Sequence, residues 1–170
     1  MRLRPMQEAD WSAVLRLNEE SVELVSPLDE LALGWFVEQA FRATAVEADG
    51  EVVAFAFALI AGCDYGSPNY RWFSERYEQF LYLDRIIVDR SWRRRGVATM
   101  TYDAMESVAS AFGRQLCEVD LEPPNVQSLA FHAARGYEQV GELTVPSGKT
   151  RSMLAKELGG STSGCASIQV

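Results

Sequence analysis

The sequence contains little histidine and little cysteine. Among its 170 residues, His132 is the single histidine, and the three cysteines, Cys63, Cys117 and Cys165, are far apart. Because no pair of these side chains has the spacing of metal ligands, we expect no metal site. An odd number of cysteines without a signal peptide favours a reduced, cytoplasmic protein.

Long hydrophobic runs and broad basic surfaces are also missing from the sequence. The longest apolar run, residues 52–61, is too short to cross a bilayer, so we expect no membrane partner. The chain carries 16 basic and 24 acidic residues, for a net charge of −8. Five of the basic residues gather within positions 85–95: Arg85, Arg90, Arg93, Arg94 and Arg95. One basic spot on an acidic chain favours a small anionic ligand and argues against a nucleic-acid partner.

The length and composition predict one soluble globular domain. Hydrophobic residues make up 48% of the chain and charged residues 24%, which is ordinary for such a domain. A chain of this length can bury a core of its own, and we assign residues 1–158 to a single domain. Residues 159–170 are rich in glycine and serine and predict a flexible tail.

Residues 81–98 form the stretch around which the chain is organised. Residues 81–88 are nearly all branched or aromatic, which predicts a strand that is buried on both faces. Asp84 and Arg85 interrupt this apolar run, and such interruptions inside a buried strand are frequent at functional sites. An apolar stripe with helical spacing runs from Val97 to Ala111 and predicts a helix.

The turn between this strand and this helix is a candidate anion site. The first backbone N–H groups of a helix lack partners within the helix, and the helix dipole adds positive charge at the same end. Gly96 has no side chain, so an anion can approach the backbone closely, and three arginines precede it. A phosphate or pyrophosphate is therefore the predicted ligand, and the alternative is a basic helix start that only binds water.

Two blocks of the sequence resemble motifs of the GNAT N-acetyltransferase superfamily. The first is Arg93-x-x-Gly96-x-Ala98, which resembles the pattern [Gln/Arg]-x-x-Gly-x-[Gly/Ala] between a strand and a helix. The second is Asn125-x-x-Ser128-x-x-Phe131-His132-x-x-x-Gly136-Tyr137, which resembles Asn-x-x-[Ala/Ser]-x-x-Phe-Tyr-x-x-x-Gly-Phe. The resemblance implies an α/β fold of the acyl-CoA N-acyltransferase type, with a central, mostly antiparallel sheet flanked by helices.

The order of the predicted elements agrees with that fold. Turn and cap signals place strands at residues 1–6, 41–47, 51–60, 115–121, 137–145 and 150–158, besides the strand at 81–88. Asp10 and Asn125 are the predicted N-caps of two helices. Pro27, with Asp29 close behind, opens another helix, one more follows Gly96, and Pro68 is a candidate start for a short one.

The same resemblance implies acetyl-CoA as acyl donor. Its pyrophosphate would bind backbone amides of residues 94–99, its pantetheine arm would run beside residues 86–88, and Asn125 would hydrogen-bond that arm. One departure is Arg94, where many members carry a second glycine. The predicted cofactor-binding residues are Ile86, Ile87, Val88, Arg93, Arg94, Arg95, Gly96, Val97, Ala98, Thr99, Asn125, Ser128 and His132.

Acetyl transfer to an amine requires a base, and the departing thiolate needs a proton. Asp84 is the predicted base, with Tyr82 as the alternative, and burial in the strand would raise the pKa of Asp84. Asp84 has an equally ordinary interpretation as the ion-pair partner of Arg85. His132 stands where the family frequently has a tyrosine that is thought to protonate the thiolate. An imidazolium could do the same, or His132 could only line the groove. The backbone N–H near Val88 is the expected oxyanion donor, and no metal is needed.

The leading functional hypothesis is an acetyl-CoA-dependent N-acetyltransferase that acts on a primary amine of a small or amino-acid-like molecule. The alternatives are a non-catalytic acyl-CoA-binding or sensing module, and a protein acetyltransferase that modifies a lysine or an N-terminus. Residues 61–79 carry several aromatic side chains. They have three open interpretations: an acceptor pocket, a cap on the sheet or a homodimer contact.

Overall fold

The computed structural model describes residues 1–23 and 25–159 and forms a mixed α/β fold. The predicted tail therefore falls almost entirely outside the described residues. The strands are β1 (Arg2–Pro5), β2 (Arg42–Ala48), β3 (Glu51–Ile60), β4 (Leu81–Val88), β5 (Arg114–Glu122), β6 (Glu138–Thr144) and β7 (Thr150–Glu157). The α-helices are α1 (Trp11–Glu19), α2 (Glu30–Gln39), α3 (Pro68–Ser74), α4 (Val97–Ala109) and α5 (Val126–Ala134). Three short 3-10 helices are η1 (Glu8–Asp10), η2 (Arg90–Trp92) and η3 (Ser110–Phe112).

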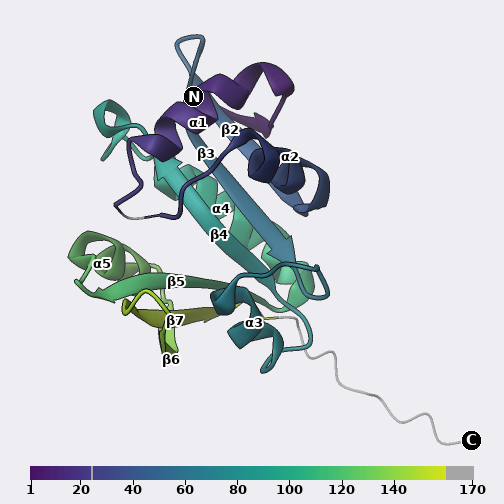
Figure 1. Ribbon diagram of the computed structural model, residues 1–170, viewed down its shortest axis with the longest axis vertical. Helices are drawn as coiled ribbons and strands as arrows, with labels where there is room; N and C mark the ends of the chain where they lie inside the picture. The colour runs from purple at the N-terminus through teal and green to yellow at the C-terminus, as the bar shows by residue number, and fades with distance from the viewer. Residues whose placement is uncertain (24, 160–170) are drawn as a thin grey trace, which may run out of the picture.

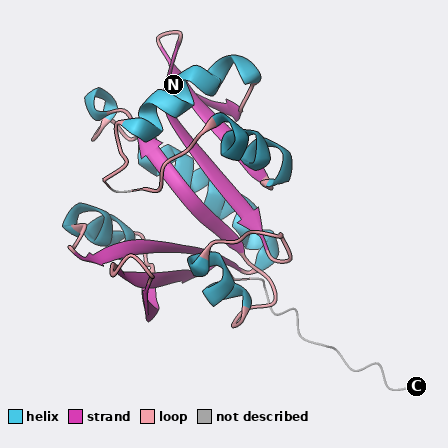
Figure 2. Cartoon of the chain, viewed as in Figure 1, coloured by secondary structure: helices cyan, strands magenta, loops and turns pink. Residues whose placement is uncertain are grey.

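One sheet of seven strands connects the whole domain in the order β1-β2-β3-β4-β5-β7-β6. All neighbouring strands pair antiparallel except β4 and β5, which are parallel. The predicted mostly antiparallel sheet with flanking helices is thus confirmed. Figure 1 and Figure 2 show the strands of the two halves diverging on one side of the molecule.

The parallel pair is also the shortest contact between neighbouring long strands. Only Leu81 with Gln115 and Tyr82 with Leu116 are paired, after which β4 and β5 separate. On the other side of β4, Arg85 pairs with Phe57 while Leu83 pairs with Ala58, so Asp84 is an extra residue in a bulge. A bulge turns side chains away from the regular alternation, and this one presents Asp84 where the strands diverge.

The core lies on both faces of the sheet, as the apolar character of residues 81–88 predicts. On one face, α1, α2 and α3 cover a cluster that contains Leu17, Phe36, Phe73 and Tyr82. On the other face, α4 packs on Leu81, Leu83 and Cys117. Burial on both faces makes β4 a rigid support for whatever its polar side chains bind.

The predicted elements match the observed ones within one to three residues at most ends. The Asp49-Gly50 turn joins β2 to β3, and both residues have positive φ angles, 53° and 82°. The prediction that Asp10 caps the first helix is wrong, because η1 precedes α1 and Asp10 binds elsewhere. Its carboxylate accepts hydrogen bonds from Arg4 Nη1 at 2.6 Å and from the backbone N–H of Gln7 at 2.8 Å.

Residues 61–79 cap the sheet, as one of the three interpretations predicts, and the acceptor pocket stays a prediction. Tyr70 and Phe73 of α3 are buried in the core and cap the sheet, with 3% and 0% of their surface exposed. Residues 64–67, which precede α3, and the first two residues of α3, Pro68 and Asn69, line a cleft instead. The third interpretation, a homodimer contact, stays a prediction.

Candidate acetyl-CoA and amine site

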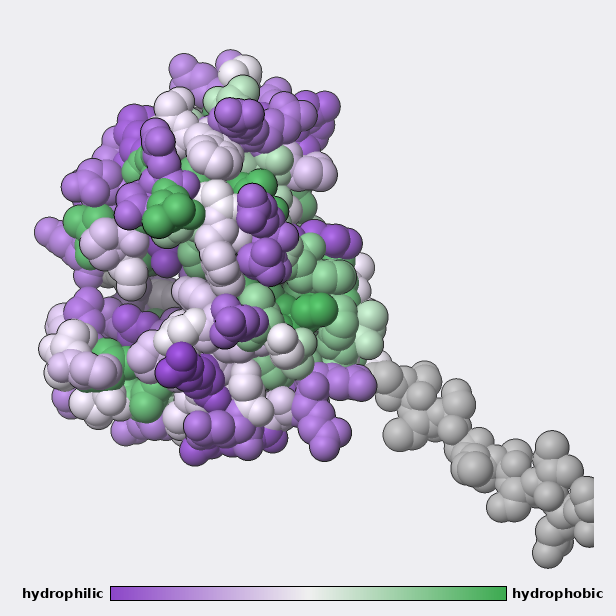
Figure 3. Space-filling view, turned by 45° about the vertical axis from the view of Figure 1, so that its right-hand side comes forward, coloured by the Kyte–Doolittle hydropathy of each residue, from purple (hydrophilic) through white to green (hydrophobic). Residues whose placement is uncertain are grey.

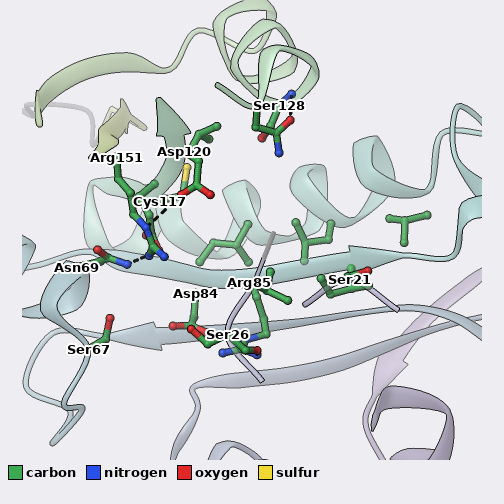
Figure 4. Close-up of a pocket in the computed structure, with 18 of the residues that line it drawn as sticks. Ser21, Ser26, Ser67, Asn69, Asp84, Arg85, Cys117, Asp120, Ser128 and Arg151 are labelled. Atoms are coloured by element: carbon green, nitrogen blue, oxygen red, sulfur yellow. Dashed lines mark hydrogen bonds and ion pairs between the residues drawn. The ribbon is translucent and has the colours of Figure 1, made fainter. Parts of the chain in front are cut away.

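A cleft of about 1010 Å³ opens where β4 and β5 separate. Its walls come from β4, β5, the first turns of α4 and α5, the α1–α2 connection and the residues before α3. The space-filling view is hollowed on its left side, between the upper and lower parts of the molecule (Figure 3). The close-up in Figure 4 shows Asp84 and Arg85 on one side of this pocket and Cys117, Asp120 and Arg151 on the other.

The basic turn predicted from sequence lies at one end of the cleft. Gly96 caps α4 with a left-handed φ of 80°, and a Cβ there would meet no described atom within 4 Å. The N–H of Met100 makes the first bond of the helix, to the carbonyl of Gly96 at 2.9 Å. The amides of Val97, Ala98 and Thr99 precede that bond and point out of the helix end. This turn therefore offers an open, positively polarised cradle for an anion.

Arg94 adopts a backbone conformation that favours glycine. Its φ is 59°, in the left-handed region that non-glycine residues enter at a cost of about 1–2 kcal/mol. Arg93 donates through Nε to the carbonyl of Val88 at 3.4 Å, and the Arg95 guanidinium lies 4.9 Å from the Trp92 ring centre. Arg93 and Arg94 line the cleft, whereas Arg95 is not among its lining residues.

Asp84 lies on the cleft wall but is held by two neighbours. Its Oδ1 accepts from the Tyr65 hydroxyl at 2.7 Å, and its Oδ2 accepts from Arg85 Nε at 2.9 Å. Arg85 in turn donates to Asn18 Oδ1 at 2.9 Å and to the carbonyl of Ser26 at 3.1 Å. The ion pair thus connects β4 to α1 and to the α1–α2 connection, which is the structural role weighed from sequence.

Glu118 of β5 is a second buried acid, across the cleft from Asp84. Its side chain is 10% exposed, and it accepts from Tyr82 Oη at 2.8 Å, from Asn69 Nδ2 at 2.7 Å and from Arg151 at 3.2 Å. Burial is the largest cause that raises the pKa of Glu118, to about 8, and the charge of Asp84 adds to the rise. Glu118 can therefore gain and lose a proton near neutral pH.

Tyr82 lies behind Glu118 rather than on the cleft wall. Its ring is fully buried, and burial is the main cause that holds the pKa of its hydroxyl well above the usual range. Tyr82 donates to Glu118 and is not among the residues that line the cleft. Its geometry is that of a group that orients Glu118.

Asn69, the second residue of α3, presents an unpartnered carbonyl oxygen beside Glu118. The residue is 4% exposed, and its Nδ2 donates to Glu118 Oε1. That donation fixes the amide orientation, because the reverse orientation would set an oxygen against the carboxylate. Its Oδ1 is buried and has no hydrogen-bond partner among the described residues. An orphaned buried acceptor at the wall of a cleft indicates a ligand that donates a hydrogen bond.

His132 on α5 is hydrogen-bonded at both ring nitrogens. Nδ1 lies 2.7 Å from the carbonyl of Ser128, which can only accept, so the ring proton is on Nδ1. Nε2 is then an acceptor, and the hydroxyl of Tyr102 lies 2.6 Å from it. Burial is the largest cause that lowers the pKa of His132, and the charge of Arg135 lowers it further. This lowering favours the neutral ring, which works against the imidazolium, one of the two roles predicted for His132 from sequence.

Most of the residues predicted from the two motifs meet in this one cleft. Asn125 caps α5, as predicted, by accepting from the N–H of Ser128 at 3.1 Å. The predicted residues that line the cleft are Asp84, Ile86, Ile87, Val88, Arg93, Arg94, Gly96, Val97, Ala98, Thr99, Asn125, Ser128 and His132. Tyr82 and Arg95 are the two that do not line it. Whether each residue binds a cofactor stays a prediction.

Three further residues of the cleft were missed from sequence: Asn69, Tyr102 and Glu118. Glu118 carried a signal, because it is an acidic residue inside a strand whose neighbours are buried, as Asp84 is. Asn69 and Tyr102 carried none, since their partners lie 49 and 30 residues away along the chain.

Comparisons with known proteins agree with this geometry. A family model described as the acetyltransferase (GNAT) family matches residues 6–137. No curated protein matches the chain in sequence. Several solved structures share the fold at low sequence identity, and that likeness concerns the fold alone.

Three of those structures cover nearly all of this chain. Ard1 from Thermoplasma volcanium has a TM-score of 0.73 at 16% identity and covers 94% of this chain and 98% of its own. The ribosomal-protein-S18-alanine N-acetyltransferase from Escherichia coli has a TM-score of 0.69 at 13% identity, over 95% and 97% of the two chains. The putative acetyltransferase yncA from Salmonella typhimurium, solved with acetyl-CoA, has a TM-score of 0.69 at 15% identity, over 98% and 99%.

Proposed function

Because the chain belongs to the acetyltransferase (GNAT) family, we propose that it transfers an acetyl group from acetyl-CoA to the primary amine of a small molecule. The observation that carries this proposal is the pair of hydrogen-bond acceptors, Glu118 and Asn69 Oδ1, on one wall of the cleft. A primary amine has enough N–H groups to donate to both acceptors.

The residues of the cleft fit acetyl-CoA. A Cβ at Gly96 would enter open space beside the amides of α4, which is the room a pyrophosphate needs. Arg93 and Arg94 add positive charge there, Ile86 to Val88 offer a strand edge for the pantetheine arm, and Asn125 and Ser128 offer polar groups opposite. Bound acetyl-CoA would supply an acetyl group activated as a thioester.

Glu118 is the base that the geometry supports best. A general base is most effective when its pKa lies near the operating pH, and the pKa of Glu118 is raised to about 8 by burial. In this proposal Glu118 removes a proton from the acceptor amine, while Asn69 Oδ1 accepts a second hydrogen bond and orients the nitrogen. Tyr82 holds the Glu118 carboxylate in place from behind.

Asp84 stays the alternative base predicted from sequence. Its two oxygens are engaged by Tyr65 and by Arg85, so it must give up one of these bonds to receive a proton. Its negative charge also raises the pKa of Glu118, which gives Asp84 an indirect part in setting the base.

The acceptor side of the cleft suits a small ligand with an apolar or aromatic part. Trp35 and Tyr65 stack with ring centres 5.1 Å apart and line the cleft with Phe36. Lys149, in the β6–β7 connection, donates to the carbonyl of Glu23 at 3.2 Å and to Asp120 at 3.1 Å. Lys149 thus links the β6–β7 connection to the α1–α2 connection across the acceptor side of the cleft. This link disfavours the binding of an extended peptide.

The test compares acceptors of different size. Thiol release from acetyl-CoA is followed with a panel of small primary amines and with peptides that offer an N-terminus or a lysine. We expect kcat/KM for the best small amines to exceed that for every peptide by at least about ten-fold, because the bridged cleft rejects the longer chains. Lys149→Ala removes the contact between the β6–β7 and α1–α2 connections. In this variant, the difference in kcat/KM between small amines and peptides should be smaller.

Equal or better rates with peptides would overturn the small-molecule assignment in favour of protein acetylation. That alternative has the weaker support that two solved structures of the same fold are ribosomal-protein alanine N-acetyltransferases. The non-catalytic alternative, an acyl-CoA sensor, does not account for a buried acid with a raised pKa at the centre of the cleft. The cytoplasmic location and the homodimer stay predictions.

A further inference from the structure

The hydroxyl group of Tyr102 occupies the region of the cleft where a side chain of α5 was expected to act. Tyr102 is in the second turn of α4, six residues after Gly96, and so about 9 Å farther along the helix axis at about 1.5 Å per residue. It lines the cleft with His132 of α5 and Cys117 of β5. Its ring is 2% exposed and packs edge-on against His132 at 5.3 Å.

His132 fixes where the proton of this hydroxyl lies. Because Nδ1 donates to the carbonyl of Ser128, Nε2 must accept, and the Tyr102 O–H is the donor at 2.6 Å. Neither nitrogen of the neutral imidazole then has a free proton to give. Of these two side chains, Tyr102 is therefore the one with a proton to give. Rotation about its C–O bond can redirect this O–H group toward another acceptor.

The neighbourhood of this hydroxyl already contains a sulfur atom. Burial raises the pKa of the Cys117 thiol well above its usual range, and the Tyr102 hydroxyl opposes that rise. The Tyr102 hydroxyl therefore lies near a sulfur atom at the wall of the cleft, where it could also face the sulfur of a bound thioester. Cys117 itself stays protonated, so it does not compete as a nucleophile.

We propose that Tyr102 is the catalytic residue that protonates the departing thiolate, and that His132 is a positioning residue that holds its hydroxyl. This inference rests on the proposed acetyl transfer. As the N–C bond to the acceptor forms and the C–S bond breaks, the amine proton passes to Glu118 and the Tyr102 proton passes to sulfur. Glu118 then returns its proton to water, and Tyr102 regains one from water, so the charges balance.

Steady-state kinetics on three variants separate this assignment from the expected role of His132. Tyr102→Phe should lower kcat by roughly ten-fold to a thousand-fold with little change in KM for acetyl-CoA, because the proton acts only in the transition state. His132→Phe should also lower kcat. His132→Gln should retain most of the activity, since its amide oxygen can accept from Tyr102 as Nε2 does. Tyr137→Phe is the control, because Tyr137 packs on the same rings but donates to Glu106.

A second measurement needs no acceptor. The thiol of CoA bound to the protein is titrated by its thiolate absorbance in the ultraviolet, and affinity for CoA is measured by calorimetry. Tyr102→Phe should raise the pKa of the bound thiol and leave the affinity unchanged. Tyr137→Phe should change neither.

The results of these experiments decide whether Tyr102 or His132 protonates the thiolate. Full kcat in Tyr102→Phe, or an unchanged pKa of the bound thiol, overturns the proposal. Loss of activity in His132→Gln equal to that in His132→Phe, with Tyr102→Phe active, returns the role to His132. Absence of any turnover by the parent protein rejects the proposed function instead, and the thiol titration still tests Tyr102.

Discussion

At the scale of single residues, the chemistry of the cleft depends on the environment of Glu118. The carboxylate is removed from water, faces the charge of Asp84, and is contacted by Tyr82, Asn69 and Arg151. Desolvation outweighs these hydrogen bonds and the ion pair, so the pKa rises to about 8. The group is therefore protonated in the folded protein over a pH range in which an exposed glutamate is ionised.

If Glu118 is the base, its ionisation should determine how the reaction rate depends on pH. In the parent protein, kcat/KM should rise with pH until about 8, as Glu118 loses its proton, and then level off. Glu118→Gln should lower kcat roughly a hundred-fold or more and remove this part of the profile. The measurement is a pH–rate profile of both proteins with one amine, at saturating acetyl-CoA.

The pH dependence of stability and the activity of a second variant test the same assignment of Glu118. Because the folded pKa is raised, wild-type stability should fall as pH rises from about 4.5 to about 8, and Glu118→Gln should not show that fall. Asp84→Asn is the comparison variant for activity. If it removes the pH dependence while Glu118→Gln keeps it, Asp84 is the base and Glu118 is not.

Residue-scale prediction from sequence was possible where a local signal existed. Asp84 was identified because it interrupts an apolar strand, and Gly96 because a motif surrounds it. Asn69 and Glu118 are 49 residues apart, and their contact depends on how α3 packs against β5. No pattern along the chain encodes that contact, so this wall of the cleft could not be predicted from sequence.

At the scale of elements, the passage from β4 to α4 is the proposed anion site, and its backbone geometry supports that proposal. Arg94 and Gly96 both adopt left-handed φ angles, 59° and 80°, which turn the chain sharply and leave the first amides of α4 facing open space. Regular elements of this kind were predictable because caps, turns and apolar periodicity are local. The bulge at Asp84 was not, since its register is set by the pairing with β3.

Gly96→Ala should weaken acetyl-CoA binding by more than its effect on stability explains. The new Cβ enters the space beside the amides of α4, and the left-handed backbone adds strain of about 1 kcal/mol. Calorimetry should show a loss of affinity of about ten-fold or more, since close approach of the phosphates is blocked.

Gly50→Ala is the matched control for this substitution. Gly50 has a similar φ of 82° and similar open space around its Cα, but it lies in the β2–β3 turn, outside the residues that line the cleft. Both variants should lose similar thermal stability, and only Gly96→Ala should lose affinity. Equal affinities in the two variants would contradict the assignment of the anion site.

At the scale of the whole molecule, the proposed function depends on how β4 and β5 are arranged in the sheet. The two strands pair at one end of β4 and are separated at the other end. Two residue pairs join β4 to β5, and beyond them the separated strands form a cleft. The proposed anion site lies at one end of this cleft, and Asp84 and Glu118 line it. The order of elements and the family were predictable from sequence. The separation was not, because it depends on how α3, β5 and β7 pack together. Among the described residues, no helix has the length and apolar character needed to span a membrane.

The most direct test of this account is a single-turnover measurement of acetyl transfer. Protein in excess is mixed with acetyl-CoA that carries an isotope-labelled acetyl group and with pooled small primary amines, and both products are quantified. The account predicts one free CoA thiol for each labelled N-acetyl group, found on the small amines. Tight binding of acetyl-CoA with no labelled amine and no thiol release would contradict it.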